Sequence, residues 1–212
     1  MEALQNQINP HFLFNTLNSV SSLVRFDPDT AREMIIKLAK ILRRLLNSTE
    51  AFVPLREELE FIDAYLDIEV VRFGPDKLRV GKDLDPQSLD VMIPSMLLQP
   101  LVENSIKHGL SGKVDGGSIY LRSRMTDSKL IIEVEDDGVG MDSAHQPDPN
   151  NGTGIGMANV VERLKVLYGE TARMSVDGRE GKGTLVRLRL PLLHNTDSIP
   201  GALYEERSST RR

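Results

Sequence analysis

The stretch Gln99-Pro-Leu-Val-Glu-Asn-Ser-Ile-Lys-His-Gly109 combines helical spacing with polar groups suited to binding phosphate. Its apolar residues predict a helix over residues 94–108, which the final glycine ends. Asn104, Lys107 and His108 are three and four residues apart and therefore share one face of that helix. An amide oxygen suits magnesium, while an ammonium and an imidazole can donate to phosphate oxygens. Taken alone, the same side chains could simply decorate a helix.

The next motif, Glu135-Asp-Asp-Gly-Val-Gly-Met141, follows an apolar run that predicts a strand over residues 130–135. We expect Asp137 to lie at the end of this strand and to face a pocket, where its carboxylate can accept the exocyclic amine of adenine. Gly138 and Gly140 would let the backbone turn tightly there, because glycine tolerates positive φ. On its own, an Asp-Gly-Val-Gly sequence is most often only a turn.

Two further glycine motifs complete the set. Gly152-Thr-Gly-Ile-Gly-Met157 opens a helix predicted over residues 154–168, where backbone N–H groups can cradle an anion, and Gly181-Lys-Gly-Thr184 leads into the last predicted strand. The spacing is wrong for a dinucleotide fingerprint, and no Gly-x-x-x-x-Gly-Lys-[Ser/Thr] loop occurs. The four motifs together, in this order, predict a nucleotide pocket. Its candidate residues from these last two motifs are Gly152, Thr153, Gly154, Ile155, Gly156, Met157 and Thr184.

A separate stretch, Gln7-Ile-Asn-Pro-His-Phe-Leu-Phe-Asn-Thr-Leu-Asn18, places His11 in a helical apolar pattern. Pro10 removes a backbone donor, so either the helix kinks there or Asn9 caps a helix whose first residue is Pro10. In the second case His11 lies in the first helical turn, where the helix dipole favours a neutral, nucleophilic ring. Alone, the stretch leaves His11 open between a packed core residue and a reactive imidazole.

Two amphipathic helices are predicted near the N-terminus, over residues 1–25 and 28–48, with a short turn at Phe26 and Asp27 between them. A helical hairpin of this size buries little surface by itself. We therefore expect it to pair with a second copy, as a homodimer with a four-helix bundle.

The remaining patterns predict an α+β fold. A helix is expected over residues 54–72, and strands over 78–82, 118–124, 130–135, 173–176 and 184–190. The chain then divides into a helical part over residues 1–52 and an α/β sandwich over 53–192, with residues 53–73 as a connecting helix. Residues 193–212 have no periodicity and are expected to be disordered.

Bulk properties exclude several classes of protein. The 212 residues suffice for one or two domains, and a net charge of −5 gives no basic footprint for direct nucleic-acid binding. The lack of cysteine excludes disulfides and thiolate metal sites and fits a reducing cytosol. No run of roughly eighteen apolar residues exists, so no transmembrane helix is expected, and the N-terminus has no signal-peptide core.

The four motifs resemble the ATP-binding fold shared by gyrase, heat-shock chaperone ATPases, sensor histidine kinases and mismatch-repair ATPases. The stretch from Gln7 to Asn18 is very similar to the phospho-acceptor box of the LytS-like sensor histidine kinases, and the resemblance covers residues 1–192. It implies a kinase core that uses ATP and Mg²⁺, typically the cytoplasmic part of a membrane-anchored homodimer. Such kinases pass phosphate to the receiver domain of a response regulator, often of the LytTR type. The membrane sensor region is expected to be absent from this chain.

The same resemblance implies a role for single residues. His11 matches the phospho-acceptor, Asn104 the magnesium-binding asparagine and Asp137 the adenine-binding aspartate, while Lys107 and His108 match residues on the phosphate side. The hairpin would then serve dimerisation and phospho-acceptance, and the α/β sandwich would be the ATP-binding domain. The matched positions that complete the ATP site are Gly138, Gly140, Gly152, Gly154, Gly156 and Thr184, with residues 142–151 as a mobile lid.

The expected reaction is transfer of the γ-phosphoryl group of ATP to an imidazole nitrogen of His11. Asn15 lies one turn further on the same face and could orient a water that hydrolyses the phosphohistidine; a merely solvated residue is an equal alternative. Many kinases carry a carboxylate directly after the acceptor, and several relatives of the ATPase fold carry a glutamate four residues before the metal asparagine. Here those positions are Phe12 and Pro100, so Glu103 is the nearest candidate for the base.

Other functions can use the same ATP-binding motifs. An anti-sigma-type serine kinase on this ATPase fold would need neither the hairpin nor His11. A non-enzymatic dimerisation module could sense ATP and switch partners, although the intact histidine box argues against it. A mechanical ATPase of the gyrase or chaperone type is not expected, because those enzymes carry long additional domains.

Overall fold

A computed structural model describes residues 10–47, 50–111, 113, 115–140, 155–179 and 181–192 of the chain. Some features predicted from the sequence lie outside these residues. They are the helix before Pro10 with its cap Asn9, the lid over residues 142–151, the motif positions Gly152, Thr153 and Gly154, the side chain of Ile155, and the tail over residues 193–212.

The N-terminal helices form the predicted hairpin. Helix α2 spans Pro10–Leu23 and helix α3 spans Pro28–Asn47, so a proline stands at the first position of each. Proline suits this position because an N–H there would have no partner within the helix. The Asp27 carboxylate caps α3 by accepting from the backbone N–H of Thr30 at 3.1 Å. Pro10 is the first described residue of α2, and the histidine follows it directly.

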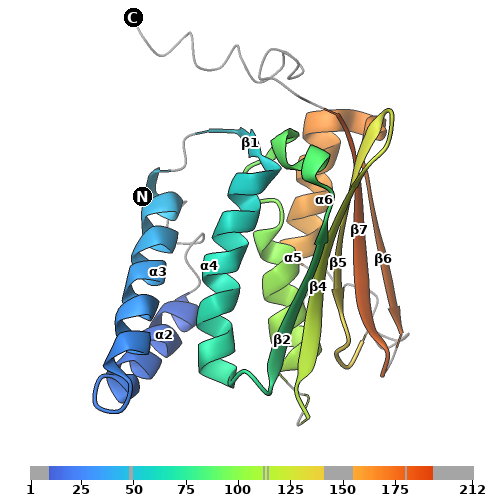
Figure 1. Cartoon of the computed structure of the whole chain (residues 1–212). Helices are drawn as coiled ribbons and strands as arrows, with labels where there is room; N and C mark the ends of the chain where they lie inside the picture. Colours follow the sequence, from blue (N-terminus) through green and yellow to red (C-terminus); the bar gives the residue numbers. More distant parts are fainter. Residues whose placement is uncertain are drawn as a thin grey trace, which may run out of the picture.

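Helix α4, Leu55–Phe73, is the central element of the fold (Figure 1). The short strand β1, Phe52–Pro54, leads into it and pairs antiparallel with β3, Met92–Pro94. More than half of the circumference of α4 is buried, with Ile62 and Ile68 at 0% exposure, and only the side that carries Glu60 and Asp67 is exposed. The helix packs against the hairpin on one side and against the α/β part on the other, and a single apolar core runs through both.

The sheet has five strands in the order β2-β4-β5-β7-β6. They are β2 Leu78–Leu84, β4 Gly117–Met125, β5 Lys129–Asp136, β6 Arg173–Arg179 and β7 Gly183–Pro191. Strands β2 and β4 run parallel, and the other neighbours run antiparallel. Alternate residues of β5, such as Ile132 and Val134, are buried, so one face of the sheet lies against helices. The predicted α+β fold is confirmed.

Helices cover that face of the sheet (Figure 1). They are the short 3-10 helices η1 Pro86–Asp90 and η3 Gly169–Thr171, the α-helices α5 Gln99–Asn104 and α6 Ile155–Tyr168, and the π-helix η2 Ser105–Leu110. The helix predicted from residue 94 starts only at Gln99, because β3 ends at Pro94 and Met96 has a φ of 56°, which a helix cannot accommodate. Among the described residues, no helix is long and apolar enough to cross a bilayer.

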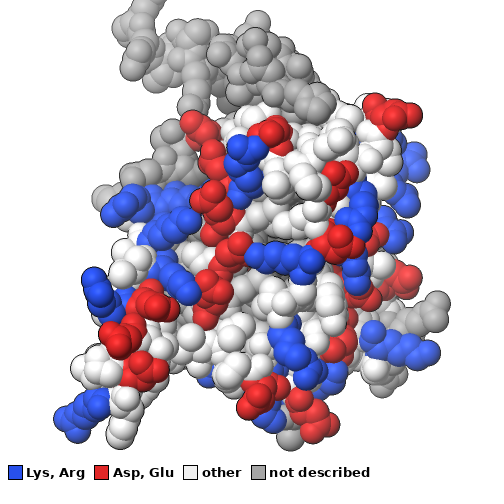
Figure 2. All heavy atoms as spheres, viewed as in Figure 1, with Lys and Arg blue, Asp and Glu red and all other residues white. Residues whose placement is uncertain are grey.

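Charged side chains join α3 to α4 along their exposed edge. Lys37 Nζ lies 2.8 Å from a carboxylate oxygen of Asp67, and Lys40 Nζ donates to Glu60 at 3.2 Å. Basic and acidic groups accordingly lie side by side over these helices (Figure 2). Exposed pairs of this kind contribute only about 0–1 kcal/mol each. The apolar contacts beneath them therefore supply most of the stability of the α3–α4 interface.

An acidic cluster is buried where α4 meets α5. Glu69 is 1% exposed and pairs with Arg72 of the same helix, while Tyr65 and Glu103 lie close enough to act on its charge. Burial raises the pKa of Glu69 to about 7, although Arg72 favours the ionised form. Burial likewise raises the pKa of Glu103 and of Tyr65.

Substitution of Glu69 by Gln tests the effect of this burial on stability. Because the pKa of Glu69 is about 7 in the folded protein and near ~4.3 in an unfolded chain, folding holds a proton that the unfolded chain has lost. The contribution of Glu69 to stability therefore falls as the pH rises through this window. Between about pH 5 and pH 8, Glu69→Gln should gain stability relative to wild type, on the order of 2 kcal/mol, in urea unfolding. The exposed control Glu60→Gln should show no trend, and a Glu69→Gln difference that does not change with pH would contradict the shift.

Candidate functional site

Asn104 is the last residue of α5 and faces the start of α6. A Cβ atom built on Gly156 would lie 3.6 Å from Asn104 Nδ2 and 4.0 Å from its Oδ1. The Nδ2 atom is buried and has no hydrogen-bond partner among the described residues. A buried polar group without a partner costs about 1–3 kcal/mol, which a bound ligand would recover. The amide of Asn104 is therefore available to a ligand on the α6 side of the helix.

Lys107 and His108 follow on the π-helix η2, and both are exposed. The wide turn is held by Ser111 N–H, which donates to Ile106 O at 2.9 Å. Such π turns are rare and often occur at functional sites. Partial desolvation and the charge of Lys107 lower the pKa of His108, which favours the neutral ring. These two side chains offer donors about one turn beyond Asn104.

The end of η2 and the turn after β5 approach each other closely. Val139 N–H donates to Gly109 O at 3.0 Å, and a Cβ atom on Gly138 would lie 2.2 Å from the same oxygen. A Cβ atom on Gly109 would in turn lie 2.6 Å from Asp136 Oδ1. Neither position has space for a side chain, so this contact between glycines joins the α5–η2 segment to the strand end. Gly140, with a φ of 75°, then turns the chain away.

Asp136 is the aspartate that faces the helices. It continues the buried row of β5 that includes Val134, and it is 3% exposed. Its carboxylate accepts from the N–H of Gly138 at 3.1 Å and also from the Ser105 hydroxyl and the N–H of Thr184. Burial raises the pKa of Asp136, although these hydrogen bonds favour the charged form. Thr184, predicted to lie near adenine, is the direct partner of Asp136 on β7.

Asp137, expected to face the pocket, follows the last residue of β5 and lies beside η2: a Cβ atom on Gly117 would lie 2.4 Å from both Asp137 Oδ1 and Leu110 Cδ2. Its carboxylate accepts from Ser118 N–H at 2.9 Å and lies 3.2 Å from Lys113 Nζ, and its side chain is 44% exposed. Desolvation would raise the pKa of Asp137, but these hydrogen bonds and the Lys113 charge outweigh it and lower the pKa. The adenine contact of Asp137 stays a prediction, and the buried Asp136 is a second candidate for it. The alternation of apolar residues over 130–136 is the sequence signal that predicts Asp136 as the buried aspartate of the two.

His11 lies exposed in the first turn of α2, while the helix buries Phe12 and Thr16. The Phe12 ring packs 4.8 Å from the ring of Tyr65 on α4. Asn15 Nδ2 lies 3.2 Å from His11 Nδ1 and 3.1 Å from Nε2, so the amide can donate to whichever ring nitrogen lacks a proton. The histidine is thus not a packed core residue, which was the alternative that the sequence left open.

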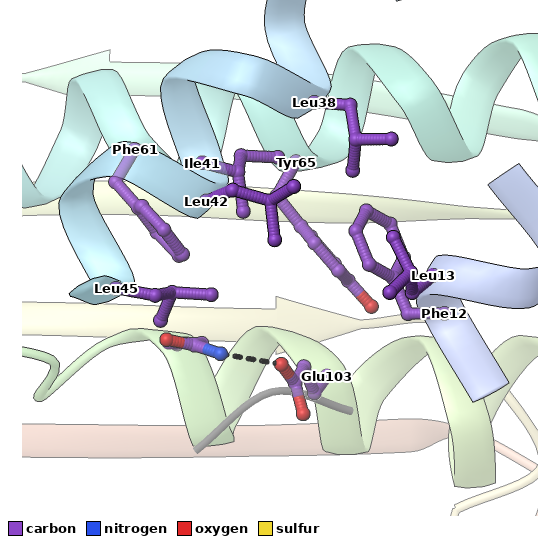
Figure 3. A pocket seen from close by; sticks show the side chains of 10 residues that line it. Phe12, Leu13, Leu38, Ile41, Leu42, Leu45, Phe61, Tyr65 and Glu103 are labelled. Atoms are coloured by element: carbon purple, nitrogen blue, oxygen red, sulfur yellow. Dashed lines mark hydrogen bonds between the residues drawn. The ribbon is translucent and has the colours of Figure 1, made fainter. Parts of the chain in front are cut away.

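A narrow cleft lies between the hairpin, α4 and α5 (Figure 3). Side chains nearly fill it and leave a cavity of only about 10 Å³, and its lining is apolar except for Tyr65, Gln99 and Glu103. Gln99 Nε2 donates to Glu103 Oε1 at 2.7 Å, the bond drawn as a dashed line. Phe12 lines this cleft, but His11 does not, so Glu103 faces the apolar side of α2. The arrangement gives no contact through which Glu103 could take a proton from His11, and its role as a base stays a prediction.

Two family models match the chain: the histidine kinase model over residues 1–78, and the histidine kinase-, DNA gyrase B- and HSP90-like ATPase model over residues 90–194. The chain belongs to the histidine kinase family. Sensor protein LytS of Oceanobacillus iheyensis is 39% identical over 201 residues, which are 90% of this chain and 34% of LytS. Sensor histidine kinase YpdA of Escherichia coli is 41% identical over 175 residues, 80% of this chain and 31% of YpdA. This histidine kinase chain thus spans about a third of the length of these curated relatives.

Solved structures of other histidine kinases share the fold. The kinase domain of the blue-light-activated histidine kinase of Erythrobacter litoralis matches with a TM-score of 0.52 over 90% of each chain, at 19% identity. The histidine kinase AdeS of Acinetobacter baumannii gives 0.51 over 83% of this chain and 81% of AdeS, at 18% identity. At such identities the likeness concerns the fold alone. The family models and the LytS relatives confirm the resemblance to LytS-like sensor histidine kinases.

The described residues of this histidine kinase fit a magnesium nucleotide. The partly buried side chain of Asn104 offers an amide oxygen as a ligand, and Lys107 and His108 offer donors for phosphate. The buried carboxylate of Asp136 offers an acceptor for a base amine. Within the described part of the chain, no three His, Asp or Glu side chains are grouped to hold a metal by themselves. Magnesium bound through phosphate oxygens and waters needs only one or two protein ligands, which matches this donor set.

Nucleotide binding should distinguish the two neighbouring aspartates. Asp136→Asn removes the buried charge that would accept the adenine amine. We expect this variant to lose about tenfold or more in ATP affinity, because a hydrogen bond to a charged group contributes about 1.5–3 kcal/mol. Asp137→Asn makes the same chemical change on the exposed side, so its affinity should stay within about threefold of wild type. Titration calorimetry with Mg–ATP measures both variants. If Asp137→Asn lost more ATP affinity than Asp136→Asn, the adenine contact would belong to Asp137.

Proposed function

We propose that this chain is the kinase core of a two-component sensor histidine kinase. It transfers the γ-phosphoryl group of ATP to His11, and from there to an aspartate in the receiver domain of a response regulator, with a LytTR-type regulator as one class of partner. The observation that carries the proposal is an exposed imidazole, contacted by the amide of Asn15, on the same chain as groups that fit magnesium–ATP. The names of the relatives, sensor protein LytS and sensor histidine kinase YpdA, agree with this reaction.

The transfer requires positioning more than covalent assistance from the protein. The lone pair of one His11 ring nitrogen attacks the γ-phosphorus, the N–P bond forms as the bond to the β–γ bridging oxygen breaks, and ADP leaves. The other ring nitrogen carries the proton. With its amide turned so that the oxygen faces the ring, Asn15 can accept from that N–H and hold the reactive tautomer. Magnesium, when bound, reduces the negative charge that the imidazole approaches.

We assign the two ends of ATP to two groups of residues. Asn104 holds magnesium, with Lys107 and His108 directed to the triphosphate, while Asp136 accepts the adenine amine beside Thr184. The glycines Gly138 and Gly140 keep the backbone close to the base. The phosphate cradle is assigned to Gly152, Thr153, Gly154, Ile155, Gly156 and Met157, of which the last three belong to the first turn of α6.

Asn15 is also placed to act after the transfer. Its Nδ2 lies within 3.2 Å of both His11 ring nitrogens, so its amide would lie next to a phosphoryl group on either one. There it can hold a water for hydrolysis of the phosphohistidine, which would return the kinase to its unphosphorylated state.

The exposed face of the hairpin supports a homodimer. Large apolar side chains remain in solvent on α2, α3 and the turn between them. Their exposed fractions are 66% for Phe14, 47% for Leu17, 87% for Phe26, 51% for Ile35 and 62% for Leu46. Burial of such side chains contributes about 1.5–3 kcal/mol each, and a second hairpin would cover them in a four-helix bundle. Residues 1–52 then form the dimerisation and phospho-acceptor part, and residues 53–192 form the ATP-binding domain.

Incubation with γ-labelled ATP and magnesium tests the proposal. Wild type should acquire label that is stable in alkali and labile in acid, as expected of phosphohistidine, and His11→Gln should acquire none. Asn18→Gln, an exposed polar change on the same helix, should label like wild type. Label that survives His11→Gln would exclude His11 as the acceptor. Wild type that binds ATP but stays unlabelled would indicate an ATP-binding switch or, with labelled serine on a partner, a serine kinase.

Glu103→Gln tests the remaining candidate for the base. General bases typically contribute about 10²–10⁴-fold to a rate. Because Glu103 faces the apolar side of α2 and is bonded to Gln99, we expect the rate of His11 labelling to change by less than about threefold, far below that range. Glu60→Gln provides an exposed control for the loss of one charge. A fall of about 100-fold with unchanged ATP affinity would establish Glu103 as the base.

A further inference from the structure

The carboxylate of Glu58, on α4, is completely buried and accepts four hydrogen bonds. Oε1 accepts from the N–H of Met96 and from Nη2 of Arg44, both at 2.8 Å. Oε2 accepts from the N–H groups of Leu97 and Leu98, at 3.0 and 3.3 Å. A buried carboxylate is costly unless it is paired and hydrogen-bonded, so the surrounding segments must keep these donors in place.

The backbone that Glu58 binds leads directly into the helix that carries Asn104. Met96 has a φ of 56°, unusual for a residue with a side chain, in the turn that presents three successive N–H groups to one carboxylate. Leu98 is the N-cap of α5. Glu58 thus binds the N–H of the N-cap residue and of the two residues before it, and so holds the backbone that enters the Asn104 helix.

Two other elements hold the same turn. Arg163 of α6 donates to Ser95 O at 2.6 Å. The N–H of Ser95 donates to Ala51 O at 3.0 Å, and its hydroxyl donates to Glu50 O at 2.9 Å. Residues 95–98 are therefore a junction of α4, α6 and the segment between the hairpin and β1.

Arg44, on α3, is the hairpin residue that binds at this junction. Besides Glu58, it donates to Glu57 O at 2.5 Å, and its guanidinium lies 5.6 Å from the centre of the Phe61 ring. Its side chain is 20% exposed, so solvent screens its pair with Glu58 only in part. Arg43, the preceding residue, is exposed and makes no hydrogen bond or ion pair with the described residues, which makes it a matched control.

We propose that Arg44 is a positioning residue for phosphoryl transfer: through Glu58 it holds the phospho-acceptor hairpin in register with the start of the Asn104 helix. The inference rests on the proposed function. Without Arg44, the three backbone N–H groups still hold Glu58, so the nucleotide site keeps its shape. The loss of Arg44 therefore affects the transfer step, which depends on the relation between hairpin and nucleotide, and spares the affinity for ATP.

A comparison of Arg44→Gln with Arg43→Gln in the full chain tests this role, since both remove one charge from neighbouring positions of α3. We expect Arg44→Gln to lower the rate of His11 labelling at saturating Mg–ATP by about tenfold or more, with the Kd for ATP within about twofold of wild type. Arg43→Gln should leave both quantities unchanged. Arg44→Lys keeps the charge but not the planar fork, and should recover part of the rate.

Equal labelling rates in Arg44→Gln and Arg43→Gln would overturn the inference. A rate above wild type in Arg44→Gln would also overturn it, because Arg44 would then restrain the hairpin. A parallel loss of ATP affinity and thermal midpoint would make Arg44 a structural residue only. If wild type and Arg43→Gln bind ATP but acquire no label, the proposed function fails and this inference fails with it. If wild type acquires label and the two variants label at equal rates, this inference is refuted and the proposed function stands.

Discussion

The site depends on the contact of two backbone segments that meet where neither has a side chain. Gly138 approaches Gly109 so closely that a Cβ atom on it would lie 2.2 Å from the Gly109 carbonyl oxygen. This contact brings the end of the helix with Asn104 to the end of β5. An amide and a carboxylate that are distant in the sequence thereby reach one side of the sheet. A side chain at either glycine would push η2 from the strand and move Lys107 and His108 with it.

Local patterns were sufficient to predict the elements that carry these groups. Helical spacing identified both helices of the hairpin, and the proline at position 28 marked where the second one begins. Glycine motifs identified the turn after β5 and the start of β7. Each of these features depends on residues that are neighbours in the sequence. For the same reason, the location of His11 on a helix could be predicted, with its exposure left open.

Features that depend on distant residues could not be predicted in the same way. Two adjacent aspartates fit the motif after β5, and the choice depends on which face of the strand is buried; the apolar alternation before Asp136 would have answered this. The role of Glu58 had no such signal. A glutamate near the start of a helix ordinarily lies in solvent, and its donors here come from Arg44 and from the turn over residues 95–98. The positive φ of Met96 also has no sequence signal, because glycine is absent there.

The interface between the hairpin and α4 has two ends with different physical character. At the α2 end, Phe12 packs against Tyr65, and apolar contacts of this kind are non-directional and tolerate small displacements. At the α3 end, hydrogen bonds to a buried carboxylate require particular distances and angles. The polar end therefore defines one relative position of hairpin and ATP site, whereas the apolar end permits several. His11 lies at the apolar end, where a displacement toward a phosphate costs least, while the start of the Asn104 helix stays fixed at the polar end.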